Sequence, residues 1–372
     1  MHRSIVRFRA LRIVCGVVLL LLAQRASAAE LPRVRLVATG GTISNRLGSR
    51  LTSAELLASI PGLDRYVVAE AEQFANTASS ALTLEQWLQL TRRINDLFQK
   101  DPGLAGIVVT SGTDTLEELA YFLDLTVRDA RPVVVVGSMR NPSTLGYEGA
   151  ANLLEGFRAA AAPASRGKGT LVVLNDEINA ARDVTKTDAL RLQTFQSRAV
   201  GILGVVDQDR VVYYRDLVRR HAAASEFDLA GVAELPRVDV IMVYQGASGD
   251  LIRAAADAGA KGIVIASAGA GATSGTQDSG IDYAVGKGVV VVTSTRAGSG
   301  RIASRRLPGA AGPDAAAPGS GATAAQPTAA PRPRPLRVAA EDLAPLKARI
   351  LLMLALTKTQ SPVEIQRMFG EY

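Results

Sequence analysis

The stretch Val34-Arg35-Leu36-Val37-Ala38-Thr39-Gly40-Gly41-Thr42-Ile43 joins a short apolar run to a polar turn. A second stretch repeats this design: Gly106-Ile107-Val108-Val109-Thr110-Ser111-Gly112-Thr113-Asp114-Thr115. Short runs rich in Val, Ile and Leu are typical of buried parallel strands. Ligands of open α/β sheets bind at the carboxyl ends of strands, so we expect the two threonine-rich turns to share one crevice. Hydroxyl-based nucleophilic chemistry is the resulting hypothesis.

The rest of the chain alternates apolar runs with helical patterns. Further strand-like runs begin near Val133, Leu171, Ile202, Val238, Ile263 and Val289. Capping-box patterns that predict helix starts begin at Thr83, Thr115 and Ser361. This alternation predicts an α/β protein with two doubly wound, mainly parallel-sheet domains, the larger one N-terminal and the smaller one C-terminal.

Composition suggests where these domains begin and end. We expect an N-terminal domain over residues 31–214, a polar, alanine-rich linker over 215–236 and a C-terminal domain over 237–372. Within the last of these, 21 of the 28 residues from 308 to 335 are Ala, Pro or Gly. A segment of this composition cannot build a packed core, and we therefore predict a disordered insert there.

The first 28 residues have the pattern of a secretory signal peptide. A basic start precedes an apolar run over 13–23, which is too short to span a membrane, and Ala26-Ser27-Ala28 provides a cleavage pattern. We expect cleavage after Ala28, a periplasmic or secreted mature protein, and no stable membrane association. An uncleaved membrane anchor is the alternative.

Removal of this leader changes the charge balance. Residues 1–28 hold five arginines and no acid, so 37 basic residues then face 35 acidic ones and the formal net charge falls from +7 to +2. No basic cluster interleaved with aromatic residues remains, so nucleic-acid binding is not supported. Cys15 leaves with the leader, and His221, expected in a surface stretch, is the remaining histidine. Disulfides, a histidine-based metal site and a Ser-His-Asp triad are therefore disfavoured.

Three residue types could together perform the chemistry. Thr42 follows two glycines directly after a strand, although a tight turn with an incidental threonine would look the same. Asp114 could cap a helix or bind a substrate ammonium. Lys186 lies among threonines in Arg182-Asp183-Val184-Thr185-Lys186-Thr187; it is either a solvated loop lysine or a buried base. Together they would make a nucleophile, a base and an orienting acid without histidine.

These segments resemble the bacterial L-asparaginases, especially the secreted asparaginase/glutaminase branch. The resemblance covers roughly 31–301 and 336–372. It is carried by four ordered motifs and the C-terminus: 38–43 (Ala-Thr-Gly-Gly-Thr-Ile), 111–118 (Ser-Gly-Thr-Asp-Thr-Leu-Glu-Glu), 135–140 (Val-Val-Gly-Ser-Met-Arg), 182–187 and 347–359.

The resemblance implies a two-step amidohydrolase that uses neither a metal nor an organic cofactor. Thr42 would attack the side-chain amide of L-asparagine, and water would hydrolyse the acyl-enzyme to aspartate. Thr113, Asp114 and Lys186 would form a second polar cluster, in which Lys186 assists proton transfer through Thr113.

The resemblance also implies a binding site for a small amino acid. Asp114 would hold the α-ammonium, and Ser79, with Ser80 beside it, would bind the α-carboxylate. The expected oxyanion donors are backbone amides near Gly41, Gly112 and Thr113. The implied assembly is a homotetramer, a dimer of close dimers with active sites between neighbouring chains.

The chain departs from the family pattern at three places. Leu51 stands where a lid tyrosine is expected, Ala272 replaces the asparagine of a glycine loop, and no residue matches the glutamate expected just beyond Arg301. Two alternatives therefore stay open: a catalytically weak homologue that binds an amino acid, and a hydrolase for another ω-amide. The preference between asparagine and glutamine is open as well.

Overall fold

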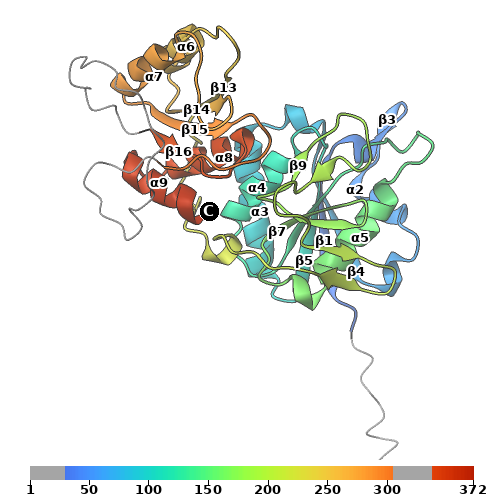
Figure 1. Ribbon diagram of the computed structural model, residues 1–372. Coiled ribbons are helices and arrows are strands. Elements are labelled where there is room, and N and C mark those ends of the chain that lie inside the picture. The colour runs from blue at the N-terminus through green and yellow to red at the C-terminus, as the bar shows by residue number, and fades with distance from the viewer. Residues whose placement is uncertain (1–29, 305–336) are drawn as a thin grey trace, which may run out of the picture.

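A computed structural model describes residues 30–304 and 337–372 (Figure 1). The predicted signal peptide and the predicted insert over 308–335 lie outside the described residues. The described chain forms two α/β units, each built on a sheet of its own. The predicted two-domain α/β fold, with the larger unit N-terminal, is confirmed.

In the described part of the chain, the N-terminal sheet has eight strands in the order β12-β11-β8-β7-β6-β5-β1-β4. Their bounds are β1 (Arg33–Gly40), β4 (Val68–Thr77), β5 (Leu104–Thr110), β6 (Val133–Val136), β7 (Thr170–Leu174), β8 (Glu177–Ala180), β11 (Gly204–Val206) and β12 (Val211–Tyr213). The neighbouring strands β4, β1, β5, β6 and β7 pair in parallel. Strands β8, β11 and β12 continue the sheet with antiparallel pairing. Strand β1 has β4 on one side and β5 on the other, so the order in which strands are added to the sheet reverses direction at β1. Open α/β sheets bind ligands at such a point.

Helices and two small hairpins complete this unit. The helices are α2 (Ser53–Ala58), α3 (Leu84–Lys100), α4 (Leu116–Thr126) and α5 (Gly149–Ala161); the hairpins pair β2 (Asn45–Arg46) with β3 (Ser49–Arg50) and β9 (Thr185–Lys186) with β10 (Phe195–Gln196). The capping box predicted at Thr83 forms at the start of α3. The one predicted at Thr115 is wrong: its side chain caps nothing, and Glu118 instead pairs with Arg349, 3.3 Å away.

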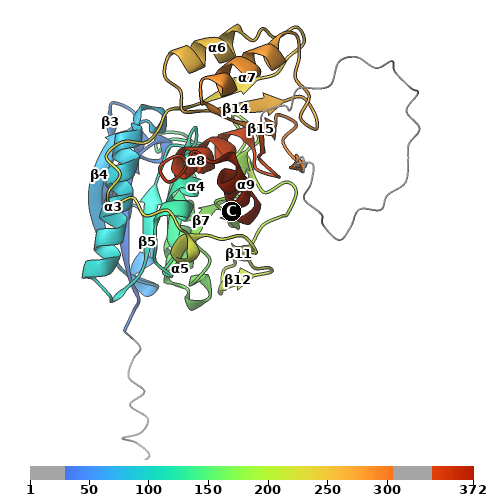
Figure 2. The ribbon, with the colours of Figure 1, turned by 90° about the vertical axis from the view of Figure 1, so that its left-hand side faces the viewer.

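The C-terminal unit is a parallel sheet in the order β13-β14-β15-β16. Its elements are β13 (Val238–Met242), α6 (Asp250–Asp257), β14 (Gly262–Ser267), α7 (Gln277–Gly286), β15 (Val290–Thr295), β16 (Val338–Ala339), α8 (Pro345–Ala355) and α9 (Pro362–Glu371). Helix α8 lies between the small sheet and α4 (Figures 1 and 2). One apolar core therefore runs through both units, from Leu116 and Tyr121 on α4 to Leu351 on α8.

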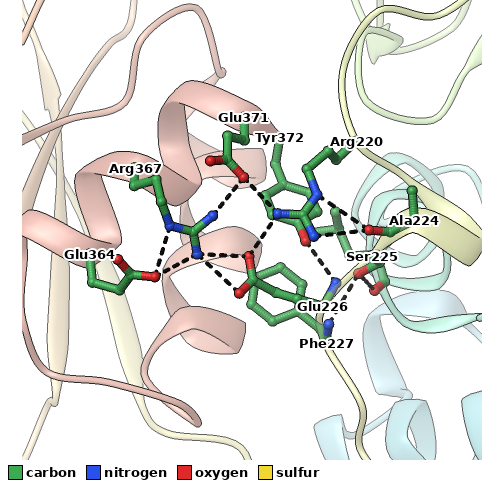
Figure 3. A network of polar contacts seen from close by, with 10 residues as sticks. Arg220, Ala224, Ser225, Glu226, Phe227, Glu364, Arg367, Glu371 and Tyr372 are labelled. Carbon is green, nitrogen blue, oxygen red and sulfur yellow. Dashed lines mark hydrogen bonds and ion pairs between the residues drawn. The ribbon is translucent and has the colours of Figure 1, made fainter.

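The predicted linker, 215–236, is fastened to the C-terminal helix by alternating charges (Figure 3). Arg220 Nη1 lies 2.6 Å from Glu371 Oε2, and Arg367 Nη2 lies 3.0 Å from Glu226 Oε2. These side chains keep roughly a quarter to a third of their surface exposed, so each pair adds little stability. Their joint effect is to hold the linker along α9.

His221 lies in a surface stretch, as expected, with Asp216 and Val218 exposed nearby. The His221 side chain is half-buried, with Nδ1 2.7 Å from Arg219 O and Nε2 2.9 Å from Gly167 O. Both contacts are made only when both ring nitrogens carry hydrogen, as in the imidazolium ion. Burial opposes this charge, but the carboxylate of buried Asp124 and the two carbonyls outweigh it and raise the pKa of His221.

This arrangement predicts that His221 makes the free energy of unfolding depend on pH. Its pKa is higher in the folded state than the unfolded value near 6.5, so its contribution is complete below that value and is lost as pH rises through the folded pKa. Between pH 6 and 8.5 the melting temperature of the wild type should therefore fall more than that of His221→Asn. Parallel melting curves of the two proteins over this range would contradict the prediction.

Candidate active site

The turns after β1, β4 and β5 meet at one edge of the N-terminal sheet. Gly41, with φ of 92°, is so close to the next turn that a Cβ there would lie 2.3 Å from Gly112 N. A Cβ on Gly112 would in turn lie 2.7 Å from Ser79 Oγ. Side chains at either position would push the turns apart. The two glycines thus bring the segments carrying Thr42, Ser79 and Thr113 together, so the two threonine-rich turns lie next to each other.

Thr42 opens a short 3-10 helix, η1 (Thr42–Ser44), and is half-buried. The carbonyls on either side of it are held: Tyr147 Oη donates to Ile43 O at 2.8 Å, and Arg50 Nη1 donates to Gly41 O at 3.2 Å. The Thr42 hydroxyl itself has no hydrogen-bond partner within residues 30–304 and 337–372. It is therefore a hydroxyl available for reaction on a fixed backbone.

Lys186 joins the second polar turn. Its Nζ donates to Thr113 Oγ1 and to Asp114 Oδ1, both at 3.0 Å. The side chains of Lys186 and Asp114 are 17% and 75% exposed, so the cluster has a protected side at Thr113 and an open side at Asp114. Since α4 is capped at Thr115 without a side-chain bond, Asp114 does not cap the helix. Thr113, Asp114 and Lys186, which the resemblance groups in a second polar cluster, are thus in contact.

Backbone amides at this edge differ in availability. Gly41 N already donates to Thr77 O at 2.8 Å, so this amide is not a free oxyanion donor. In the part of the chain that the structure describes, the amides of Gly112 and Thr113 donate to no acceptor. Those two remain as candidate donors. Ser79 is buried next to them, whereas Ser80 is exposed.

Two family models together match most of the chain. "Asparaginase, N-terminal" matches residues 33–219, and "Glutaminase/Asparaginase C-terminal domain" matches 237–369. The chain belongs to the asparaginase family. It is therefore an enzyme of the amidohydrolase class.

Individual relatives match this asparaginase-family chain over most of their length. L-asparaginase 2 of Bacillus subtilis (strain 168) is 41% identical, covering 93% of this chain and 89% of that protein. The glutaminase-asparaginase of Pseudomonas fluorescens biotype A is 36% identical, covering 92% and 91%. The crystal structure of a probable cytoplasmic L-asparaginase from Campylobacter jejuni superposes with a TM-score of 0.80 at 34% identity, covering 92% of this chain and all of that one.

Glu117 contacts the segment of Lys186 in this candidate site, and sequence reasoning missed it. It lies in the first turn of α4 and is 5% exposed. Its Oε1 accepts hydrogen bonds from Thr185 Oγ1 at 3.0 Å and from Lys186 N at 3.2 Å. In the sequence, an acid at a helix start suggests capping, and nothing there indicates that this carboxylate holds the strand that carries Lys186.

The departures from the family pattern have structural counterparts. Leu51 is buried in the apolar core, and its amide donates to Ser44 O. Both contacts hold the β2–β3 hairpin against the rest of the N-terminal unit. Of the two arginines on this hairpin, Arg50 donates to Gly41 O in the turn of Thr42, while Arg46 pairs with Glu55. Ala272 is exposed in a tight loop.

Within residues 30–304 and 337–372, no group of three or more His, Cys, Asp or Glu side chains could hold a metal ion.

Proposed function

We propose that this protein is an exported L-asparaginase that converts L-asparagine to L-aspartate and ammonia through an acyl-enzyme on Thr42. The observation that carries the proposal is the Lys186–Thr113 hydrogen bond of 3.0 Å, in a turn packed directly against the turn of Thr42. A nucleophilic hydroxyl, a second hydroxyl and an amine in one crevice are what a threonine-based acyl transfer needs. Membership of the asparaginase family supports the same reaction.

In the first step, the Thr42 oxygen forms a bond to the amide carbon, and the carbonyl oxygen becomes an oxyanion. The amides of Gly112 and Thr113 are available to stabilise it, a contribution of about 3 kcal/mol for each donor in comparable sites. Collapse of this intermediate breaks the C–N bond, and the leaving nitrogen takes the proton from the threonine and departs as ammonia. A water molecule then attacks the ester, aided by Thr113 and Lys186, and restores the Thr42 hydroxyl while releasing aspartate.

Substrate orientation rests on Asp114 and Ser79. One oxygen of Asp114 accepts from Lys186, and because the side chain is 75% exposed it can also accept from an α-ammonium. Buried Ser79 lies against Gly112, where its hydroxyl can donate to an α-carboxylate, and the adjacent Ser80 is exposed. Glutamine is a second substrate in this proposal, as the name of the Pseudomonas relative suggests.

The test is ammonia release from L-asparagine and from L-glutamine by the chain without residues 1–28. Added hydroxylamine should be converted to the aspartyl hydroxamate, because an acyl-enzyme transfers its acyl group to amines as well as to water. Release of ammonia without hydroxamate would contradict the covalent step. Absence of release at millimolar substrate would favour an amino-acid binding protein or a hydrolase for another ω-amide.

Export and assembly are part of the same proposal. The leader pattern over 1–28 supports delivery to the periplasm or beyond, and detection of the full-length chain solely in the cytoplasm would contradict it. No helix within residues 30–304 and 337–372 is long and apolar enough to cross a membrane. The family assembly would be a homotetramer, which light scattering of the purified protein tests directly.

Arg50 should influence substrate capture more than chemistry. Its bond to Gly41 O fastens the β2–β3 hairpin beside Thr42, and a hydrogen bond from a charged group is worth about 1.5–3 kcal/mol. Because the side chain is partly exposed, we expect Arg50→Met to raise KM for L-asparagine about tenfold. The matched control is Arg46→Met, in which the lost pair is with Glu55 outside the site. Equal effects of the two substitutions would show that Arg50 has no special role.

A further inference from the structure

A fully buried lysine of the C-terminal unit reaches into the N-terminal unit. Lys347, in the first turn of α8, is 1% exposed. Its Nζ donates to Glu117 O at 2.8 Å and to Ala181 O, and it lies 5.5 Å from the centre of the Tyr121 ring. Burial lowers the pKa of Lys347 to about 8 against the opposing effect of nearby carboxylates.

The two carbonyls that Lys347 contacts belong to the two segments carrying the second polar cluster. Glu117 lies in the first turn of α4, directly after the turn of Thr113 and Asp114. Ala181 follows β8 and precedes Lys186 by five residues. One amine therefore ties together the backbone on both sides of the Lys186–Thr113 hydrogen bond.

Glu117 continues this connection with its side chain. Its backbone carbonyl accepts from Lys347, while its Oε1 accepts from Thr185 Oγ1 and from Lys186 N. Its Oε2 is buried and has no hydrogen-bond partner in the described part of the chain. A buried carboxylate oxygen without a partner destabilises the folded state, so ordinary packing does not explain an acid at this position.

We propose that Lys347 and Glu117 are positioning residues that hold Lys186 in line with Thr113, so that the C-terminal unit controls the reactive geometry within its own chain. An amine buried at this depth costs more free energy than a methionine of similar length, and what it provides in return is two directed hydrogen bonds. The inference rests on the proposed hydrolase function for its kinetic readout only.

A cavity adjoins the Lys347 side chain, which leaves room for a substitution there. The cavity, with a volume of about 70 Å³, lies between the two units, and its walls include Lys347, Thr185, Arg182 and Asp183. Lys347→Met keeps the length of the side chain and removes its buried charge. This offsets part of the cost of leaving the two carbonyls without a donor, so we expect the variant to fold. Glu117→Ala is a second variant, which keeps the Glu117 carbonyl for Lys347.

Each variant should reduce kcat at least about tenfold, since a displacement of about 1 Å can cost on the order of 10²-fold in rate. Lys168→Met is the matched control: Lys168 is also mostly buried, but it pairs with Asp216 at the far end of the sheet. A double-mutant cycle separates positioning from a general structural role. If Lys347 acts through Lys186, Lys347→Met should have little further effect on the residual rate of Lys186→Met. An equal loss on both backgrounds would overturn the proposal.

Hydrogen exchange provides a readout that does not depend on activity. The amide of Lys186 donates to Glu117 Oε1, so it should exchange faster in both variants, while the amides of α3 stay unchanged. Wild-type kcat together with wild-type exchange would overturn the proposal. If the wild type releases no ammonia, the proposed function fails, and the exchange result alone decides whether Lys347 and Glu117 position Lys186.

Discussion

Replacing Thr42 by alanine should reduce ammonia release from L-asparagine at least about 10³-fold, the scale on which enzymes lose rate when a covalent nucleophile is removed. The hydroxyl is the group that would form the bond to substrate, and it makes no hydrogen bond within residues 30–304 and 337–372. Its loss should therefore leave the fold intact. Initial rates and the yield of aspartyl hydroxamate measure the effect, and melting temperature confirms folding.

Thr42→Ser is the matched control, because it keeps the hydroxyl and removes only a methyl group. We expect it to retain measurable turnover, and Thr42→Ala to bind L-aspartate with an affinity close to that of the wild type in calorimetry. An alanine variant that still releases ammonia at more than about a hundredth of the wild-type rate would place the nucleophile elsewhere.

Lys186→Met should lower kcat by about 10²–10⁴-fold, the range typical of a lost proton-transfer group. The substitution removes both hydrogen bonds of the amine, to Thr113 Oγ1 and to Asp114 Oδ1, but keeps the length of the side chain. Because the groups that lose a donor are one uncharged hydroxyl and one mostly exposed carboxylate, the stability cost should stay at about 1 kcal/mol. Single-turnover measurements would show whether acylation or hydrolysis of the ester is slowed.

The control for this substitution is Lys287→Met at the C-terminal cap of α7, where the amine pairs with Asp257 in an exposed position. It should leave kcat unchanged. Retention of more than about a tenth of kcat in Lys186→Met would exclude proton transfer by this amine. Asp114 would then be the remaining charged side chain of the cluster with a role in the reaction.

The fold was predictable where buried elements show as runs of apolar residues along the sequence. In strand β5 the five residues that follow Ala105 are all buried. This is the short buried run that indicates a central parallel strand. Strand β4, Val68–Thr77, was not predicted, because it is an edge strand in which every residue is exposed or half-buried, Glu70 and Glu72 among them. An edge strand needs no apolar face of its own, so its sequence resembles a loop.

This missed strand explains why Ser79 could be placed only through a family resemblance. The serine follows the end of β4, and the pairing of β1 with β4 brings it next to Gly112. Thr42 and Thr113 were accessible from the residues alone, because each follows a recognisable strand. Lys186 was a weaker prediction, since a lysine among threonines has the same sequence pattern whether it is solvated or buried.

The sequence by itself determined the alternating α/β pattern, the glycine turns after β1 and β5, and the threonines they present, because periodicity and backbone freedom are local properties. Only the tertiary structure decided that Gly41 N is already bonded, that Glu117 holds Lys186, and that Lys347 reaches across from α8. These contacts join residues 36 to 230 positions apart. Hydrogen bonds between buried polar groups depend on distance in space, and no local pattern records which distant segments the packed core brings together.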